Sequence, residues 1–425
     1  MVFHTLTITK IYKKSLDLKQ MDREEIDWNS LSRIRILDFT DETASFCSKL
    51  LADIGAKVIK VERPKGDRSR RIGPFFKKVP SQEESLFFWY HNTNKEGITL
   101  NIEKEEGRNI LLKLLQRFDV FIESYPPGYL ERLGLGYKSL SNINPKIIMI
   151  SITPFGKGGP RSHYKSSDLI VSAFGGQMAI SGFPKKTPLK PYGEQSFYLG
   201  SLYGAIAVLL ALIKREKTGK GDHIDISIQE AIVSTLDQVL VRYFSEKMIC
   251  QRRGGISGNY SWCILPCKDG HILITPFYQW DTLIEWMDSE GMAEDLKEDR
   301  WKDEIYRIDH FDHIFEVISR WTLTHTKGEL FEIAQLMRLP WAPIFSPNEA
   351  IKIPQLKERK FFINVYHPEI KADLYYPGSP YQINGTSMSG KKRAPFIGEN
   401  NFKFYNEELG LSEKEIKRLS SLGVI

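Results

Sequence analysis

The longest apolar stretch of the chain covers residues 196–216. Almost every position in it is apolar or small, so the pattern predicts a helix that is buried on most sides. Residues 218–221 (TGKG) supply a glycine that ends such a helix, and the alternating residues 222–227 predict a strand after it. The helix begins at a polar cluster that includes Glu194 and Gln195. Because helix N-termini favour negative charge, we expect anionic chemistry at this end.

The first part of the chain alternates between strand and helix patterns. Residues 35–39 and 56–62 have the pattern of strands, and residues 43–54 between them have helical spacing. The alternation continues with strands at 98–102, 119–123 and 146–153 and a helix at 107–118. Strands that alternate with helices predict a parallel sheet, and therefore an α/β fold of Rossmann-like type.

The turn after the first predicted strand does not carry a dinucleotide-binding motif. Residues 40–43 (TDET) lack the GxGxxG pattern that lets the backbone approach a pyrophosphate. No Walker motif occurs in the sequence. We therefore expect neither a nicotinamide cofactor nor a P-loop nucleotide.

The composition is that of a globular protein with about two or three domains. The chain has 425 residues, of which 41% are hydrophobic and 26% charged, and its formal net charge is +6. This charge suits anionic small molecules but lacks the basic stripe of nucleic-acid-binding proteins. Lys214 and Arg215 end the longest apolar segment short of a charge-free bilayer span, and residues 1–30 form a polar extension without a signal-peptide pattern. We expect a cytoplasmic protein that binds neither nucleic acid nor membrane.

The cysteines do not indicate a disulfide or metal protein. Four cysteines are too few for a disulfide framework in a chain of this length, which favours a reducing compartment. Cys263, Cys267 and the nearby His271 resemble half of a zinc site, but the sequence supplies no second half. We therefore expect structural cysteines and no metal.

Basic residues gather just after the predicted strand 56–62. The cluster comprises Arg63, Arg68, Arg70 and Arg71. These residues lie at the sheet edge where open α/β folds bind their ligands, and arginine suits phosphate groups because its guanidinium forms paired hydrogen bonds. The pattern leaves two interpretations open, a ligand site and a solvated loop.

Many short motifs occur in the order typical of one enzyme family. They include residues 51–62 (LADIGAKVIKVE), 64–67 (PKGD), 94–95 (NK), 132–134 (RLG), 151–156 (SITPFG), 217–221 (KTGKG), 340–343 (PWAP) and 394–398 (APFIG). In this order they resemble the class III CoA-transferases, the family of formyl-CoA and carnitine CoA-transferases. The resemblance extends from about Ser32 to the C-terminus.

The resemblance implies a Rossmann-like large domain formed from both ends of the chain, a smaller α+β domain between them, and an interlocked dimer. On this basis we divide the chain into an N-terminal extension (1–30), the first part of the large domain (31–225), the small domain (226–340) and the return to the large domain (341–425). The resemblance also implies that coenzyme A passes from an acyl-CoA to a carboxylic acid, after an aspartate attacks the thioester. Such chemistry needs a carboxylate nucleophile and backbone donors for the oxyanion.

The resemblance also implies a set of CoA-binding positions. Those that fall where the family contacts the adenine, phosphates or pantetheine are Ala44, Arg63, Leu100, Tyr125, Arg132 and Lys165. Asp168 matches an acidic position near the thioester and is a candidate catalytic residue. The first turn departs from the formyl-CoA branch, because Asp41 and Glu42 fall within the family's His-Val-Gln stretch. Two acids there would repel an anionic ligand, so we expect this pocket to be empty or retuned.

The family's nucleophilic aspartate does not carry over. Counting back from Thr218 and from Gly200 places its position at Ser196. A serine cannot form the acyl carboxylate anhydride of the family mechanism, and its structural role would be an N-cap for the helix. Glu194 is the nearest carboxylate and replaces the nucleophile only if the loop before the helix is rebuilt. Asp168 and Glu194 are therefore the candidate catalytic residues.

The resemblance leaves the assembly open. Residues 151–156 and 195–197 are similar to the branch of succinyl-CoA:(R)-benzylsuccinate CoA-transferases of anaerobic aromatic degradation, in which a subunit with the aspartate pairs with one that lacks it. This branch implies a paralogous aspartate-bearing partner in a heterodimer or heterotetramer. The alternatives are a homodimeric protein that binds CoA or acyl-CoA without transferase activity, and an active transferase that uses Glu194. The racemase branch is not favoured, because it uses a histidine where this chain has Ser167.

Overall fold

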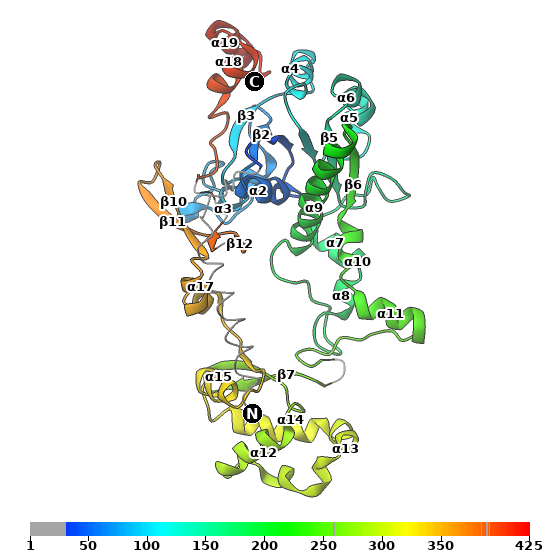
Figure 1. The fold of residues 1–425 in the computed structure, drawn as a ribbon, viewed down its shortest axis with the longest axis vertical. Coiled ribbons are helices and arrows are strands. Elements are labelled where there is room, and N and C mark those ends of the chain that lie inside the picture. The colour runs from blue at the N-terminus through cyan, green and yellow to red at the C-terminus, as the bar shows by residue number, and fades with distance from the viewer. Residues whose placement is uncertain (1–30, 258–259, 384, 388–389, 391) are drawn as a thin grey trace, which may run out of the picture. The chain divides into compact units, whose positions relative to one another are not determined.

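The computed structural model describes residues 31–257, 260–383, 385–387, 390 and 392–425 (Figure 1). The predicted extension of residues 1–30 lies outside them. Contacts divide the chain into two compact units. Unit 1 comprises the described residues up to Ser151 together with Gly204–Ile224 and Ile363–Ile425, and unit 2 comprises Ile152–Tyr203 and Asp225–Phe362. Residues 152–203 and 341–362, which we assigned to the large domain, thus cluster with the middle of the chain.

The largest sheet has six strands in the order β3-β2-β1-β4-β5-β6. Their bounds are β1 (Arg35–Phe39), β2 (Lys57–Glu62), β3 (Glu96–Thr99), β4 (Val120–Glu123), β5 (Ile148–Thr153) and β6 (His223–Ser227). The pairs β1–β2, β2–β3, β1–β4 and β4–β5 are parallel. The chain moves outward from β1 to β3 and then returns to the other side of β1, so β1 and β4 flank the point where open α/β sheets bind ligands. The predicted α/β fold class is confirmed.

Alternation along the strands gives the sheet of unit 1 two different faces. Leu37, Ile59 and Phe121 point to one face and are fully buried. This face packs on helices from both ends of the chain, and Figure 1 shows the C-terminal α18 and α19 near α4. The helices of unit 1 include α2 (Ser45–Asp53), α3 (Leu86–His91), α4 (Glu105–Leu115), α5 (Tyr129–Arg132), α6 (Tyr137–Ile143), α18 (Asn401–Leu409) and α19 (Glu413–Ser421). Burial of each large apolar side chain contributes roughly 1.5–3 kcal/mol, which fixes this layer.

The opposite face holds a buried ion pair beside α2. The Asp38 carboxylate accepts hydrogen bonds from Lys95 Nζ at 2.9 Å, Ser48 Oγ at 2.6 Å and the Thr40 backbone at 3.0 Å. Burial opposes the charge of Asp38, but Lys95 and Lys60 with these hydrogen bonds hold its pKa well below the usual range. Burial lowers the pKa of Lys95 to about 8, although Asp38 favours its charged form. The pair fixes the end of β1 and the turn that follows it.

The predicted core helix is present as α9 (Gln195–Thr218), but it is less buried than its pattern suggested. Ile206, Leu210 and Ile213 are 53%, 62% and 56% exposed. Their spacing places them along one side of the helix. Among the described residues, α9 is also the one helix long and apolar enough to cross a bilayer, and half of its most apolar window is buried within the protein. A one-sided apolar stripe on a half-buried helix is typical of a surface that another chain covers.

Unit 2 contains a second core rich in tryptophan. Its sheet joins β7 (Cys263–Cys267), β8 (Gly270–Ile274) and β9 (Ala342–Pro343), all antiparallel. The helices are α7 (Asp168–Phe174), α8 (Gln177–Ile180), α10 (Ile228–Val233), α11 (Asp237–Glu246), α12 (Trp280–Ser289), α13 (Glu304–Asp309), α14 (Phe311–Thr322), α15 (Lys327–Leu336), α16 (Pro347–Ala350) and α17 (Pro354–Glu358). Trp280, Trp286, Trp301 and Trp321 are all buried in this core. Cys263 and Cys267 are buried there as free thiols, in agreement with a structural role.

Short elements complete the fold. They are the 3₁₀ turns η2 (Arg68–Arg71), η3 (Phe76–Lys78), η4 (Glu294–Lys297) and η5 (Asp299–Lys302), and the strand pairs β10 (Phe362–His367) with β11 (Ala372–Pro377) and β12 (Gln382–Ile383) with β13 (Thr386–Ser387). Of these, η2 matters for the site, because it follows β2 at the ligand edge of the sheet.

Candidate functional site

A pocket of about 460 Å³ lies at the carboxyl ends of β1, β2 and β4 in unit 1. We call it the strand-edge pocket. Its walls are the turn after β1 (Thr40 and Asp41), the loop after β2 (Arg63, Gly66, Asp67, Arg68 and Arg71) and the segment after β4 (Ser124, Tyr125 and Pro126). The pocket thus occupies the edge where the sequence predicted a ligand.

Backbone and side-chain hydrogen bonds fix these walls to one another. The Asp41 carboxylate accepts a hydrogen bond from Ser124 Oγ at 2.9 Å, and the Asp41 backbone donates to the same oxygen at 2.9 Å. The buried Lys60 ammonium donates to the Thr40 carbonyl and to the Asp67 carboxylate, the latter at 3.1 Å. Lys60 therefore ties the first turn to the loop after β2. These hydrogen bonds join all three walls of the pocket.

The arginine cluster divides into ligand-facing and structural members. Arg70 is 1% exposed, and its guanidinium binds the Glu62 carboxylate at 2.6 and 2.8 Å and lies 3.7 Å from the centre of the Phe88 ring. Arg70 is thus part of the core. Arg63, Arg68 and Arg71 line the strand-edge pocket instead, and within the described residues Arg71 makes no ion pair. The ligand-site interpretation of the cluster therefore concerns these three arginines.

The other predicted CoA-binding residues of unit 1 lie around the pocket to different degrees. Tyr125 lines it, stacks on Tyr129 with ring centres 4.6 Å apart, and has its pKa raised by burial. Ala44 is buried at the start of α2, and Leu100 is buried where its backbone bonds to the Glu62 carbonyl at 2.7 Å; neither lines the pocket. Arg132 is exposed at the end of α5 and does not line the pocket either. The structure thus brings Arg63 and Tyr125 together in one cavity.

The first-turn acids are held by neighbouring groups. Asp41 caps the turn before α2 by accepting a hydrogen bond from the Thr43 backbone at 3.0 Å. Glu42 Oε1 lies 3.1 Å from Arg68 Nε, and the Glu42 side chain is 14% exposed. Burial and the adjacent Asp41 raise the pKa of Glu42 to about 7. The two acids therefore do not add two full negative charges to the pocket at neutral pH.

Ser196, the predicted position of the family nucleophile, lies in unit 2 at the start of α9. Ser196 is buried, and its backbone donates to the Asp168 carboxylate at 2.8 Å; the Phe197 backbone donates to the same oxygen at 3.3 Å. Lys190 Nζ lies 2.7 Å from the other carboxylate oxygen of Asp168. Asp168 thus anchors the N-terminus of α9, where the helix dipole favours a negative charge.

Glu194 directly precedes α9, and its carbonyl accepts the Tyr198 backbone N–H at 3.0 Å. Its side chain is partly buried, and burial together with Asp168 raises the pKa of Glu194. Lys165 is exposed in the loop before α7. Lys190 was missed by the sequence reasoning, although a lysine four residues before Glu194 was a signal for a charge partner. The two candidate catalytic carboxylates, Asp168 and Glu194, thus lie near one another and near Lys190.

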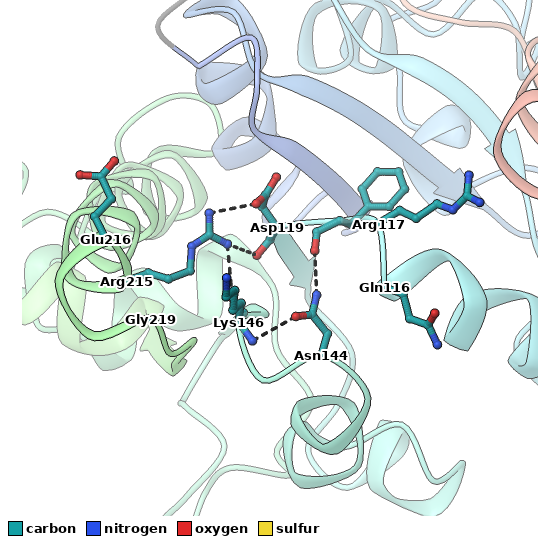
Figure 2. A pocket seen from close by; sticks show the side chains of 9 residues that line it. Gln116, Arg117, Asp119, Asn144, Lys146, Arg215, Glu216 and Gly219 are labelled. Atoms are coloured by element: carbon teal, nitrogen blue, oxygen red, sulfur yellow. Dashed lines mark hydrogen bonds and ion pairs between the residues drawn. The ribbon is translucent and has the colours of Figure 1, made fainter.

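A second pocket, of about 520 Å³, lies in unit 1 at the opposite, amino-terminal edge of the sheet (Figure 2). Arg215 points into it, but its guanidinium is bound to the Asp119 carboxylate at 2.9 Å and to the Lys146 carbonyl at 3.2 Å. Figure 2 shows Arg117 and Glu216 extending away from this ion pair. The charge of Arg215 is thus already matched by Asp119, and this pocket is the weaker candidate.

The described residues contain no group of three or more His, Cys, Asp or Glu side chains that could hold a metal ion. The charged residues that gather at the two candidate sites are arginines, a lysine and carboxylates. Such groups suit the binding of an anionic ligand and acyl transfer to a carboxylate.

Comparison with known proteins gives consistent results. A family model described as CoA-transferase family III matches residues 31–401. The succinyl-CoA:(R)-benzylsuccinate CoA-transferase subunit BbsE of Thauera aromatica is 32% identical over 403 residues, which cover 93% of this chain and 98% of the relative. A formyl-CoA:oxalate CoA-transferase of Streptomyces coelicolor is 31% identical over 417 residues, with 93% and 99% covered. Among solved structures, a CaiB/BaiF family protein from Brucella suis matches with a TM-score of 0.79 and 27% identity over 89% of this chain and 99% of that chain.

Proposed function

This chain belongs to CoA-transferase family III, and from that premise we propose that it is a subunit of an enzyme that moves coenzyme A from an acyl-CoA to a carboxylic acid. The acceptor in this proposal is a dicarboxylic or aryl-substituted acid, the class named for the Thauera relative. No metal takes part in the proposed reaction.

In this proposal the strand-edge pocket holds the nucleotide end of CoA. Arg63, Arg68 and Arg71 supply the positive charge for its phosphates, and Tyr125 supplies an aromatic wall for the adenine or pantetheine. The preformed turn between β1 and α2 supports this assignment, because a rigid site loses little entropy when it binds.

The observation that carries the subunit assignment is the structure around Ser196. No carboxylate stands at this position, and the carboxylate of Asp168, which is bonded to the Ser196 backbone, already accepts two backbone hydrogen bonds and pairs with Lys190. A carboxylate held in this way stabilises a helix and is a poor nucleophile, because attack would break its hydrogen bonds. We therefore assign the covalent step to a paralogous partner that carries the aspartate.

Two apolar surfaces support an assembly with a second chain. Ile206, Leu210 and Ile213 form the exposed stripe of α9. Helix α11 has no buried residue, and its Val241 and Phe244 are 64% and 69% exposed. Exposed apolar surface of this kind marks protein interfaces. An interlocked pair of subunits, with a paralogue or with itself, would cover such surfaces.

One observation favours a second function, an active transferase that uses Glu194. This carboxyl is partly buried beside Asp168, and its raised pKa shows an environment that disfavours the charged form. A desolvated carboxylate is a stronger nucleophile than a solvated one. The third alternative, a homodimer that binds CoA without transfer, needs no nucleophile at all.

The test is an acyl-transfer assay of the purified chain, alone and with a co-encoded paralogue, followed by hydroxylamine or borohydride trapping and peptide mass spectrometry. We expect activity and a trapped adduct only in the mixture, on the aspartate of the paralogue. Transfer by the chain alone, with an adduct on Glu194 that Glu194→Gln abolishes, would establish the second function. CoA binding without transfer under either condition would establish the third.

A further inference from the structure

Glu42 lies behind the wall of the strand-edge pocket, next to Asp41 and paired with Arg68, both of which line the pocket. It follows Asp41 in the turn between β1 and α2, and its Oε1 atom lies 3.1 Å from Nε of Arg68. Its other oxygen, Oε2, is buried and has no hydrogen-bond partner within the described residues. Glu42 is therefore a carboxyl group that is only half satisfied when it is ionised.

The side chain of Arg68, the partner of Glu42, can move, whereas the backbone of Arg68 is held in place. The Arg68 side chain is 80% exposed and lines the pocket. Its backbone belongs to η2, which the Asp67 side chain caps through the Ser69 N–H at 2.7 Å, and Asp67 is held by Lys60. The guanidinium of Arg68 can therefore pair either with Glu42 or with a ligand, without any change in the backbone.

We propose that Glu42 acts through Arg68 to set how strongly the strand-edge pocket binds a phosphoryl ligand. When Glu42 is ionised, it holds Arg68 and cancels its charge. When Glu42 takes up a proton, it releases Arg68 to the phosphates, so ligand binding and protonation of Glu42 are linked. The proposal rests on the proposed function, in which that ligand is CoA. Glu42 is a positioning residue here, because it acts on the ligand only through Arg68.

The surroundings of Glu42 place this switch near neutral pH. The charged groups that face Glu42 are Asp41 from its own turn and Asp67 and Arg68 from the loop after β2. Burial and Asp41 raise the pKa of Glu42 to about 7, and Arg68 opposes this rise. From the segment after β4, Ser124 is bound to Asp41 rather than to Glu42. Ordinary glutamates titrate near 4.3, so few other carboxyls would change charge in this range.

The test uses isothermal titration calorimetry of the full chain with dephospho-CoA, whose pyrophosphate charge is constant between pH 6 and 8. We expect the wild-type chain to bind roughly two- to fivefold more weakly at pH 8 than at pH 6, the range of a solvent-exposed ion pair. Titration at pH 7 in two phosphate-free buffers of different ionisation enthalpy measures protons directly, and we expect uptake of a fraction of a proton on binding.

The variant Glu42→Gln should bind with no proton uptake and with the same affinity at both pH values. The matched control is Glu103→Gln, since Glu103 also pairs with a pocket arginine, Arg63 at 3.3 Å, but is 54% exposed. It should keep the proton uptake of the wild type. Equal uptake by wild type and Glu42→Gln, with both shown to be folded by thermal melting, would overturn the role of Glu42. Absence of any dephospho-CoA binding at either pH would instead overturn the CoA pocket, and the linkage would fall with it.

Discussion

Replacement of Asp168 by asparagine tests whether this residue anchors a helix or performs catalysis. The side chain is 3% exposed, accepts the backbone N–H groups of Ser196 and Phe197 at 2.8 and 3.3 Å, and pairs with Lys190 at 2.7 Å. Asparagine keeps the shape and one acceptor but removes the charge. The variant Asp168→Asn therefore weakens two charge-assisted hydrogen bonds and leaves Lys190 without its carboxylate.

The expected cost follows from these contacts. A hydrogen bond to a charged group contributes about 1.5–3 kcal/mol, and a charge at a helix N-terminus contributes about 0.3–2 kcal/mol. Lys190 is 22% exposed, so water replaces part of the lost ion pair. We expect the start of α9 to be destabilised by about 2–4 kcal/mol. This corresponds to a roughly 30- to 700-fold larger equilibrium constant for local opening.

Hydrogen–deuterium exchange of the amides of Ser196 and Phe197 measures this change locally. The control is Ser196→Ala, which removes only a hydroxyl whose contact with the Asp168 carbonyl is 3.5 Å long, and which should change exchange by less than about fivefold. The anchoring role is refuted if Asp168→Asn exchanges like the wild type at these amides. Loss of transferase activity in the complex with unchanged exchange would show a catalytic role instead.

Further predictions concern pH, the core and the interface. Burial lowers the pKa of His91 to about 3, whereas the unfolded chain binds this proton near pH 6.5. The free energy of unfolding should therefore fall as the pH drops from about 6.5 to 3, by up to ~1.4 kcal/mol per pH unit. His91→Gln should make the urea-unfolding midpoint less dependent on pH in this range. Arg70→Lys loses the paired hydrogen bonds to Glu62 and should cost about 2–4 kcal/mol in the same assay, whereas Arg71→Lys should stay within about 0.5 kcal/mol. Leu210→Glu places a charge on the exposed stripe of α9 and should dissociate the proposed assembly, as a lower mass in light scattering; an unchanged mass would contradict an interface there.

The sheet was largely predictable from the sequence, because strands of a buried parallel sheet are short, continuous and apolar. The predicted strand at residues 35–39 coincides with β1, and the predicted strand at residues 146–153 contains β5. The prediction for residues 98–102 was shifted, since β3 ends at Thr99 and the chain continues by bonding its Leu100 backbone to Glu62. Strand periodicity does not reveal where the last ladder bond falls.

The sequence could not predict which arginines of the cluster are buried and which line the pocket. Side chains of one type that are close together in sequence do not indicate which of them points into the core. Arg70 turns inward because η2 places it over Glu62, and Glu62 is buried at the end of β2. A buried carboxylate needs a charge partner, whereas Arg68 and Arg71 in the same turn face the pocket. Which arginine meets the carboxylate depends on the tertiary path of the loop, which no local pattern records.

Position 196 shows the reverse case, in which the sequence predicted a position of interest but not the contacts of its backbone. The counted spacing identified Ser196, yet only the structure shows that its backbone N–H is taken by Asp168. A second carboxylate at this position would lie beside Asp168, and Lys190 could neutralise only one of the two. Like charges this close raise one of the two pKa values strongly. The serine therefore avoids a repulsion that a second carboxylate would introduce at the start of α9.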